Sequence, residues 1–260
     1  MTLAVDATSH YPGELTLNGD PRVFSHTCGA SATKLLVLTT LANSTLADRN
    51  STGCTYNGVA ATILSPEGDD GVFEHSEIYN LNSPTVGANN ISVGITGNNI
   101  QFAAYGISFV DAHDTLRSNS SATGTGTNPS VTGITTVAGD IVVGVLATDN
   151  AAGDTAVSGA GVLIFEDENV SSDSDFSAQY VVATGTSTNL SWTNSGSGDG
   201  WAITYAVVKQ LSAGGGSGPV GGANIDSKHR PIPLMQPQIA IQNMAMLVQQ
   251  PIVLMGQACL

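Results

Sequence analysis

The sequence predicts an all-β protein: a jelly-roll β-sandwich forming a single domain, followed by a flexible glycine-rich linker and an extended C-terminal arm. Charged residues make up only 11% of the 260 residues, well below the usual quarter, and 30 residues are glycine. This composition favours strands and tight turns over helices. Short apolar runs also alternate with turn-forming clusters roughly every 8–12 residues, as in a sandwich or jelly roll.

The individual apolar runs have the length and composition of strands. Residues 33–42 (TKLLVLTTLA) are apolar on both faces, which is typical of a strand buried deep in a sandwich. Asn57-Gly58 separates two strand-like runs and predicts a hairpin with a type I′ turn. In residues 72–81 the alternate positions from Phe73 share one face. The other predicted strands are residues 91–96, 102–110, 140–148, 161–166, 177–184, 189–193 and 201–209.

The two halves of this region resemble each other weakly. Residues 34–43 (KLLVLTTLAN) match residues 140–150 (DIVVGVLATDN) at an offset of 106 (141 − 35), and residues 102–110 match residues 201–209 at an offset of 99 (201 − 102). Two four-stranded units would explain the match, as expected if two Greek keys build one jelly roll. Similar β composition in both halves is the alternative explanation.

Charge and terminal pattern exclude several classes of partner. The formal net charge is -14, from 7 basic and 21 acidic residues, so phosphate backbones and anionic lipids would be repelled. We therefore expect neither a nucleic acid nor a membrane partner. Residues 1–20 lack a basic segment and a long apolar run, so we expect no signal peptide.

Four features suggest chemistry, and each has a simpler structural interpretation. Asp111–Asp114 (DAHD) fits a polar turn better than a metal site, and residues 166–175 (EDENVSSDSD) fit a solvated acidic loop better than a calcium site. We expect His26 to pack at a strand edge with one ring nitrogen satisfied. Trp192, Trp201 and Tyr205 fit the sandwich core better than an exposed platform for sugars.

No motif of a known catalytic site is present. The sequence has no nucleophile elbow, P-loop, HExxH or CxxC pattern, so we expect no enzyme, no cofactor and no metal. Cys28, Cys54 and Cys259 form neither a disulfide framework nor a zinc spacing. Cys28 and Cys54 either pair with each other or act as small buried apolar residues.

The predicted organisation is an N-terminal segment (residues 1–21), a jelly-roll sandwich (22–210), a Gly/Ser linker (211–224) and an apolar arm (225–260). Residues 231–260 contain no charged residue. We do not expect this segment to span a membrane, because Pro237, Pro251 and several Gln and Asn side chains interrupt its apolar run.

Docking on a partner protein is the function we predict for the arm, with packing on its own body or disorder as alternatives. Burial of eight apolar side chains would contribute about 12–24 kcal/mol before the costs of association. The predicted partner-binding residues are Ile239, Ile241, Met244, Met246, Leu247, Ile252, Val253 and Leu254. The pattern fits a short helix or an added strand equally well.

The order and spacing of four blocks resemble a jelly-roll β-sandwich family of bacteriophage structural proteins and bacterial surface or secreted proteins. The blocks are residues 24–41, 54–64, 124–150 and 183–209. The resemblance implies a non-enzymatic architectural or binding module and supplies no catalytic residues. We therefore expect a virion protein, a capsid decoration or cement protein on the outer particle surface. Its arm would bind the major capsid or another virion protein, and shell symmetry favours a homo-oligomer, a trimer.

A carbohydrate-binding module of a tail fibre or of a secreted or surface protein is the alternative function. It requires exposed aromatic rings, with Trp192 and Trp201 as the candidates.

Overall fold

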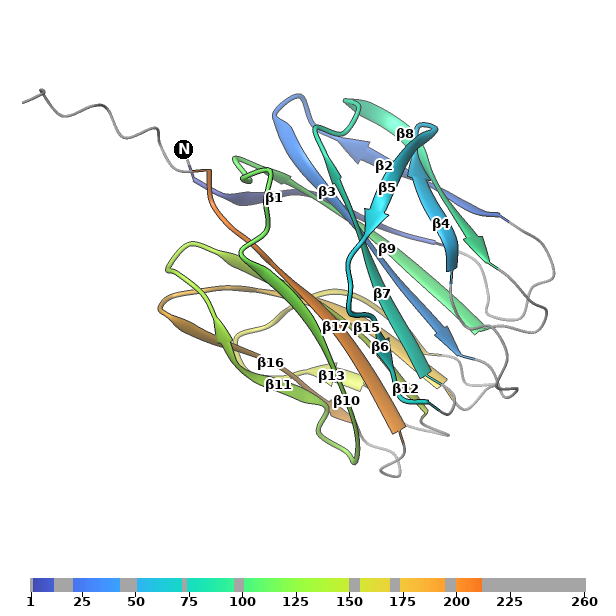
Figure 1. Cartoon of the computed structure of the whole chain (residues 1–260), viewed down its shortest axis with the longest axis vertical. Coiled ribbons are helices and arrows are strands. Elements are labelled where there is room, and N and C mark those ends of the chain that lie inside the picture. Colours follow the sequence, from blue (N-terminus) through green and yellow to red (C-terminus); the bar gives the residue numbers. More distant parts are fainter. Residues whose placement is uncertain are drawn as a thin grey trace, which may run out of the picture. The chain divides into compact units, whose positions relative to one another are not determined.

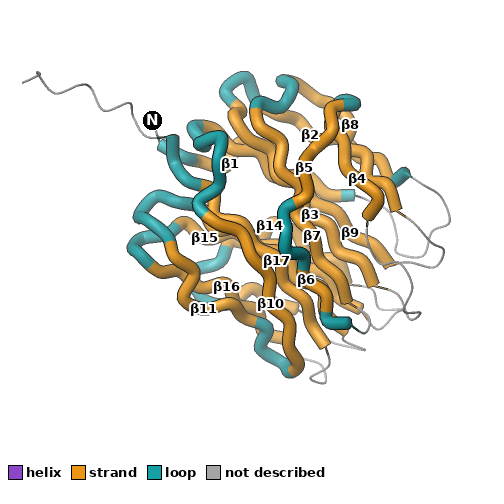
Figure 2. Tube along the Cα trace, in the orientation of Figure 1, coloured by secondary structure: helices purple, strands orange, loops and turns teal. Residues whose placement is uncertain are grey.

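The computed structural model describes residues 2–11, 21–42, 51–71, 74–95, 101–149, 155–168, 174–194 and 200–211. These residues form strands, turns and loops, with no helix among them, and Met1–Gly216 is one compact unit. The predicted all-β sandwich is therefore confirmed (Figures 1 and 2). The linker beyond Leu211 and the whole arm lie outside the described residues.

The first half is an eight-stranded jelly roll with one additional two-residue strand. Its hydrogen-bonded strand order is β1-β9-β3-β7-β5-β4-β8-β2, and β6 pairs with β7. The strands β1-β9-β3-β7 form one of two facing sheets, and β2-β8-β4 form the other. Consecutive strands alternate between these sheets, except at the β4–β5 hairpin. This connectivity is that of a jelly roll. The strands are β1 (Ala4–His10), β2 (Arg22–Cys28), β3 (Ala32–Ala42), β4 (Ser51–Tyr56), β5 (Val59–Ile63), β6 (Gly68–Asp69), β7 (Glu74–Asn82), β8 (Gly87–Ile95) and β9 (Gln101–Val110).

The hairpin turn follows its prediction from sequence. Asn57 and Gly58 have φ angles of 50° and 76°, and both positive values are required by a type I′ turn. Thr62 and Ile63 at the end of β5 pair with β7. The hairpin thus connects the two facing sheets, which nearly close into a barrel.

The second half repeats the arrangement of the first. Its sheets have the orders β10-β17-β12-β15-β14 and β11-β16-β13. These match β1-β9-β3-β7-β5 and β2-β8-β4 strand for strand. The strands are β10 (Ser118–Thr125), β11 (Ser130–Thr135), β12 (Ile141–Asp149), β13 (Thr155–Val157), β14 (Val162–Glu168), β15 (Ser174–Val182), β16 (Ser187–Asn194) and β17 (Gly200–Val208).

This repeat corrects two details of the predicted duplication. Each half contains eight equivalent strands rather than four, so each half is a jelly roll by itself. The offset of 99 between β9 and β17 keeps equivalent residues on the same face, because Phe102 lies in the cluster inside the first half and Trp201 in the cluster inside the second. Leu41 pairs with Phe102, and Thr148 pairs with Trp201. The same pairs make the β3–β12 offset 107 (148 − 41), so the predicted 106 is wrong. An error of one residue exchanges the two faces of a strand.

Three apolar clusters hold the body together. The first lies inside the first half and includes Leu35, Val37 and Ile91. A second lies inside the second half around Trp192 and Leu190. The largest lies between the halves, where β3, β7 and β9 face β12, β15 and β17; it includes Leu36, Leu38, Ile78, Phe109, Val143, Val145 and Phe176. The central strand β3 is therefore apolar on both faces because both faces are buried, as predicted.

The cluster between the halves predicts cooperative unfolding. Phe109→Ala removes a fully buried ring of the first half and should lower the free energy of unfolding by about 3–5 kcal/mol. Both tryptophans, Trp192 and Trp201, belong to the second half. Urea unfolding followed by tryptophan fluorescence should therefore show the full loss in one transition. An unchanged tryptophan transition would contradict the coupling, and Val59→Ala, at a 50% exposed site, is the control.

Candidate functional site

All eight arm residues predicted to bind a partner, from Ile239 to Leu254, lie outside the described residues. Their role remains a prediction from sequence. The candidate sites described below belong to the body.

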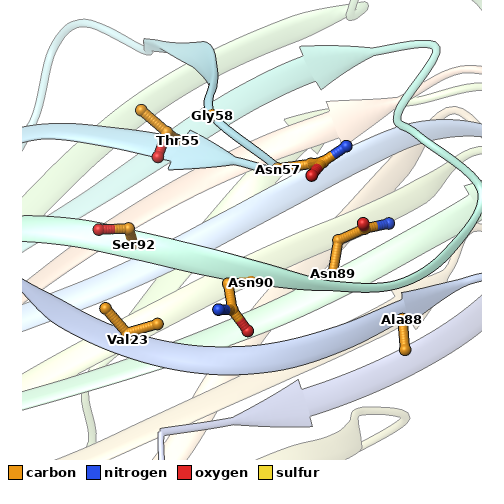
Figure 3. A pocket seen from close by; sticks show the side chains of 8 residues that line it. All are labelled: Val23, Thr55, Asn57, Gly58, Ala88, Asn89, Asn90 and Ser92. Carbon is orange, nitrogen blue, oxygen red and sulfur yellow. The ribbon is translucent and has the colours of Figure 1, made fainter. Parts of the chain in front are cut away.

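A hollow of about 450 Å³ opens on the outer face of the β2-β8-β4 sheet (Figure 3). Ser92 on β8 lies opposite Val23 of β2 on one side and Thr55 of β4 on the other. The turn residue Asn57 donates its backbone N–H to the Asn90 carbonyl at 2.9 Å, which holds the turn beside β8. The lining residues are Val23, Thr55, Asn57, Gly58, Ala88, Asn89, Asn90 and Ser92, with no charged and no aromatic side chain among them.

Glu77 is the centre of a buried polar cluster inside the first half. Its carboxylate accepts hydrogen bonds from the Ser51 N–H at 3.1 Å, from the Thr39 hydroxyl at 3.1 Å and from the Ser51 hydroxyl. His75 Nε2 lies 3.0 Å from the same carboxylate, and the Tyr79 hydroxyl contacts Ser51. As predicted from alternation, His75, Glu77 and Tyr79 share one face of β7. Burial beside Glu77 raises the pKa of Tyr79.

The geometry of this cluster differs from that of a hydrolytic triad. In a triad, histidine stands between the nucleophile and the carboxylate so that it can accept the hydroxyl proton. Here Ser51 and His75 both bond to Glu77, and no hydrogen bond joins Ser51 to His75. Glu77 and His75 are 0% and 2% exposed, whereas Ser51 is half-buried, so the cluster mainly pairs polar groups in the interior of this half.

A second cluster of polar side chains connects β1 and β2, the two edge strands of the first half. Asp6 accepts hydrogen bonds from the Gly29 N–H and the Ser108 hydroxyl, each at 2.8 Å. His26 Nδ1 lies 2.8 Å from Ser9 Oγ, whereas the buried Nε2 has no partner. His26 therefore packs at a strand edge with one ring nitrogen satisfied, as predicted. Burial lowers its pKa to about 4, although Asp6 opposes this shift.

Lys34 connects the first half to the segment that leads into the second half. Its fully buried ammonium group donates to the side chain of Asn80 at 2.9 Å, to that of Asn82, and to the Asp114 carbonyl at 2.9 Å. Burial lowers the pKa of Lys34 to about 8, and Asp114 opposes this shift. Three acceptors thus match the three donors of the ammonium group.

The sequence-predicted candidates have mainly structural positions. Asp111–Asp114 is the turn between the halves: Asp111 accepts the Thr2 N–H at 3.0 Å, and His113 Nδ1 accepts the Thr115 N–H at 3.1 Å. The polar-turn interpretation is thus confirmed. Part of the acidic segment 166–175 lies outside the described residues, but Asp175 at its end is buried.

The aromatic and cysteine residues belong to the interior. Trp192 is 0% and Trp201 9% exposed, and Tyr205 packs against the same cluster, so the core interpretation is confirmed. Trp192 also donates its indole N–H to Ser177 Oγ at 3.1 Å. Cys28 and Cys54 are buried and free, and burial raises the pKa of Cys54 to about 12. The exposed aromatic platform that carbohydrate binding through Trp192 and Trp201 requires is therefore not formed.

Comparison with known proteins finds no relative. No family model matches the chain, and no curated protein and no solved structure is significantly similar to it. Within the described part of the chain, no helix is long and apolar enough to cross a membrane. The same residues contain no group of three or more His, Cys, Asp and Glu side chains that could hold a metal ion.

Analysis of the sequence missed the hollow, the Glu77 cluster and the Lys34 contacts. The hollow had one local signal, the Asn57-Gly58 turn, but its other residues come from β2 and β8. The charged residues Lys34 and Glu77 lie within apolar strands, and this is the signal that could have marked them as buried and paired.

Acidification should destabilise the protein through His26. The folded state binds a proton at this residue only near pH 4, whereas the unfolded state does so near 6.5. The contribution of His26 to stability is therefore present above pH 6.5 and is lost as the pH falls toward 4, at up to about 1.4 kcal/mol per pH unit. Urea unfolding at several pH values measures this loss. The free energy of unfolding should depend less steeply on pH in His26→Gln than in the wild type. An equal slope in variant and wild type would contradict this assignment.

Removal of the Glu77 carboxylate should be strongly destabilising. Glu77→Ala removes the acceptor of the buried Thr39 and His75 and of the half-buried Ser51, and should lower the free energy of unfolding by roughly 3–5 kcal/mol. Glu77→Gln keeps one carbonyl oxygen and should lose less. Thermal or urea unfolding measures both. A Glu77→Ala protein as stable as the wild type would refute the structural role.

Proposed function

We propose that the protein is a non-enzymatic structural protein of a phage particle, a decoration or cement protein on the outer surface of the capsid. The observation that supports this most directly is the division of the chain into a compact body and an apolar arm that carries no charge over residues 231–260. The body has its own cores and needs no other chain to bury them. An arm without charge instead gains stability by burial on a partner.

Three features of the body support an architectural role. Tandem jelly rolls with a large buried layer between them form a stiff unit, which suits a fixed position on a shell. The ionisable members of the Glu77 cluster, Glu77 and His75, are buried, and the cluster lacks the contacts of a nucleophile relay. The high negative charge of the protein favours the solubility of a particle that carries it on its surface.

The arm is the proposed anchor, and its partner is the major capsid protein or another virion protein. The Gly/Ser segment between body and arm would span roughly 20 Å as a random coil, so the arm can reach a neighbouring subunit. Symmetric positions on a shell favour a homo-oligomer, and we propose a trimer.

The proposed anchor is tested by truncation after Asn224. The full chain should co-purify with phage particles, whereas the truncated chain should remain soluble, folded and unbound, because the apolar area of the arm is lost. Quantitative mass spectrometry of purified particles measures the occupancy.

A full-length chain with Met244→Asn, Met246→Asn and Leu247→Asn is the matched variant, because it keeps the arm length but not its apolar surface. Both variants should fall at least tenfold in occupancy. Full occupancy of the truncated chain would contradict the anchor. Mass photometry of the free full chain tests the trimer.

A further inference from the structure

We propose that the hollow on the β2-β8-β4 face is a binding site for a neutral oligosaccharide. This site is independent of the arm, and nothing in the proposed capsid role requires it. The hollow lies at the surface of the first half and takes its lining from β2, β8 and the β4–β5 turn (Figure 3). Its volume of about 450 Å³ falls within the range of small-ligand sites.

Four of the five polar side chains that line the hollow form no internal hydrogen bond among the described residues. Asn57, Asn90, Thr55 and Ser92 make no side-chain hydrogen bond within the described part of the chain. Asn89 differs, because its amide donates to the Tyr56 hydroxyl and to the Gly87 carbonyl, both at 3.3 Å. The four other side chains therefore offer donors and acceptors to a ligand at no cost to internal bonds.

The residues of the second half that are equivalent to Asn90 and Ser92 do form internal hydrogen bonds. Asn189-Leu190-Ser191 on β16 matches Asn90-Ile91-Ser92 on β8 at the offset of 99 (189 − 90), with the same order of exposed, buried and half-buried residues. Asn189 Oδ1 accepts the Gly133 N–H at 2.9 Å. Ser191 donates to the Ser158 carbonyl at 3.2 Å and accepts from the Ser158 hydroxyl at 2.7 Å.

The equivalent asparagine and serine residues therefore have different roles in the two halves. In the second half the asparagine bonds to the irregular part of β11, and the serine bonds to Ser158, which follows β13. In the first half they have no internal partner, and they face a hollow. The amide and the hydroxyl are retained at equivalent positions, but only the pair in the first half is available to a ligand.

The chemistry of the lining selects a neutral, hydroxyl-rich ligand. With a net charge of -14 the protein repels anions, and the lining has no carboxylate to pair with a cation. Amide and hydroxyl groups donate and accept, as sugar hydroxyls do. Val23, which is 44% exposed, and Ala88 provide apolar contact for the C–H face of a sugar ring. With no aromatic ring to stack on, one site should bind weakly, with a Kd of about 1 mM.

The test is a ¹⁵N NMR titration of the full chain with maltotriose, chitotriose and the anionic trigalacturonate. At least one neutral trisaccharide should shift the side-chain amide signals of Asn57 and Asn90 in a saturable way below about 20 mM. Trigalacturonate should leave them unchanged. Absence of saturable shifts with both neutral sugars, or equal binding of the anion, would overturn the proposal.

Two variants and one control locate the site. Asn90→Ala should weaken binding at least about fivefold, the effect of one hydrogen bond, with no change in Tm. Ser92→Phe fills the hollow from an outward-facing position and should abolish binding. The control Asn189→Ala should lower the Tm by a few degrees, because Gly133 loses its acceptor, but leave binding intact.

Undiminished binding by folded Asn90→Ala and Ser92→Phe proteins would refute the site. The arm truncation does not touch the hollow, so failure of one proposal leaves the other in place.

Discussion

The apolar layer between the two jelly rolls is the interaction on which the rest of the body depends. It buries the outer faces of β3, β7 and β9 against those of β12, β15 and β17, so these strands have no solvent face. Polar groups in that layer must therefore find partners inside it. Ser76 and Thr204 pair across the layer at 2.9 Å, and Ser174 donates to Glu74 at 3.1 Å. The two halves consequently form one compact unit rather than two independent domains joined by a linker.

Within this common frame the two halves have different interiors. The first nearly closes into a barrel around the buried side chains of Glu77, His75 and His26. The second remains two open sheets around Trp192 and Trp201. The outer faces also differ, because Asn189 and Ser191 of β16 bond to Gly133 and Ser158, whereas the side chains of Asn90 and Ser92 on β8 have no partner among the described residues. Equivalent polar positions are thus bonded internally in one half and unbonded at the surface in the other.

Body and arm supply separate functions under the two proposals. The arm provides attachment by apolar burial, and the body provides a rigid exposed surface. A weak site for neutral sugars on each body gains avidity if many copies are fixed on one particle. The charge pattern fits both proposals, since a high negative charge favours solubility whereas residues 231–260 and the lining of the hollow carry no charge.

The sequence by itself determined the features that depend on local chemistry. These are the strands between turn clusters, the Asn57-Gly58 turn with its two positive φ angles, and the burial of Trp192 and Trp201, which follows from the scarcity of aromatic residues. The internal repeat was also visible. Its register was not, because β3 is apolar on both faces and lacks the period of two that would reveal a shift of one residue.

Only the tertiary structure decided that each half is a complete jelly roll, which buried oxygens surround Lys34, which donors surround Glu77, and which residues form the hollow. Those partners come from strands distant in sequence, and their contacts exist only once the sheets have paired.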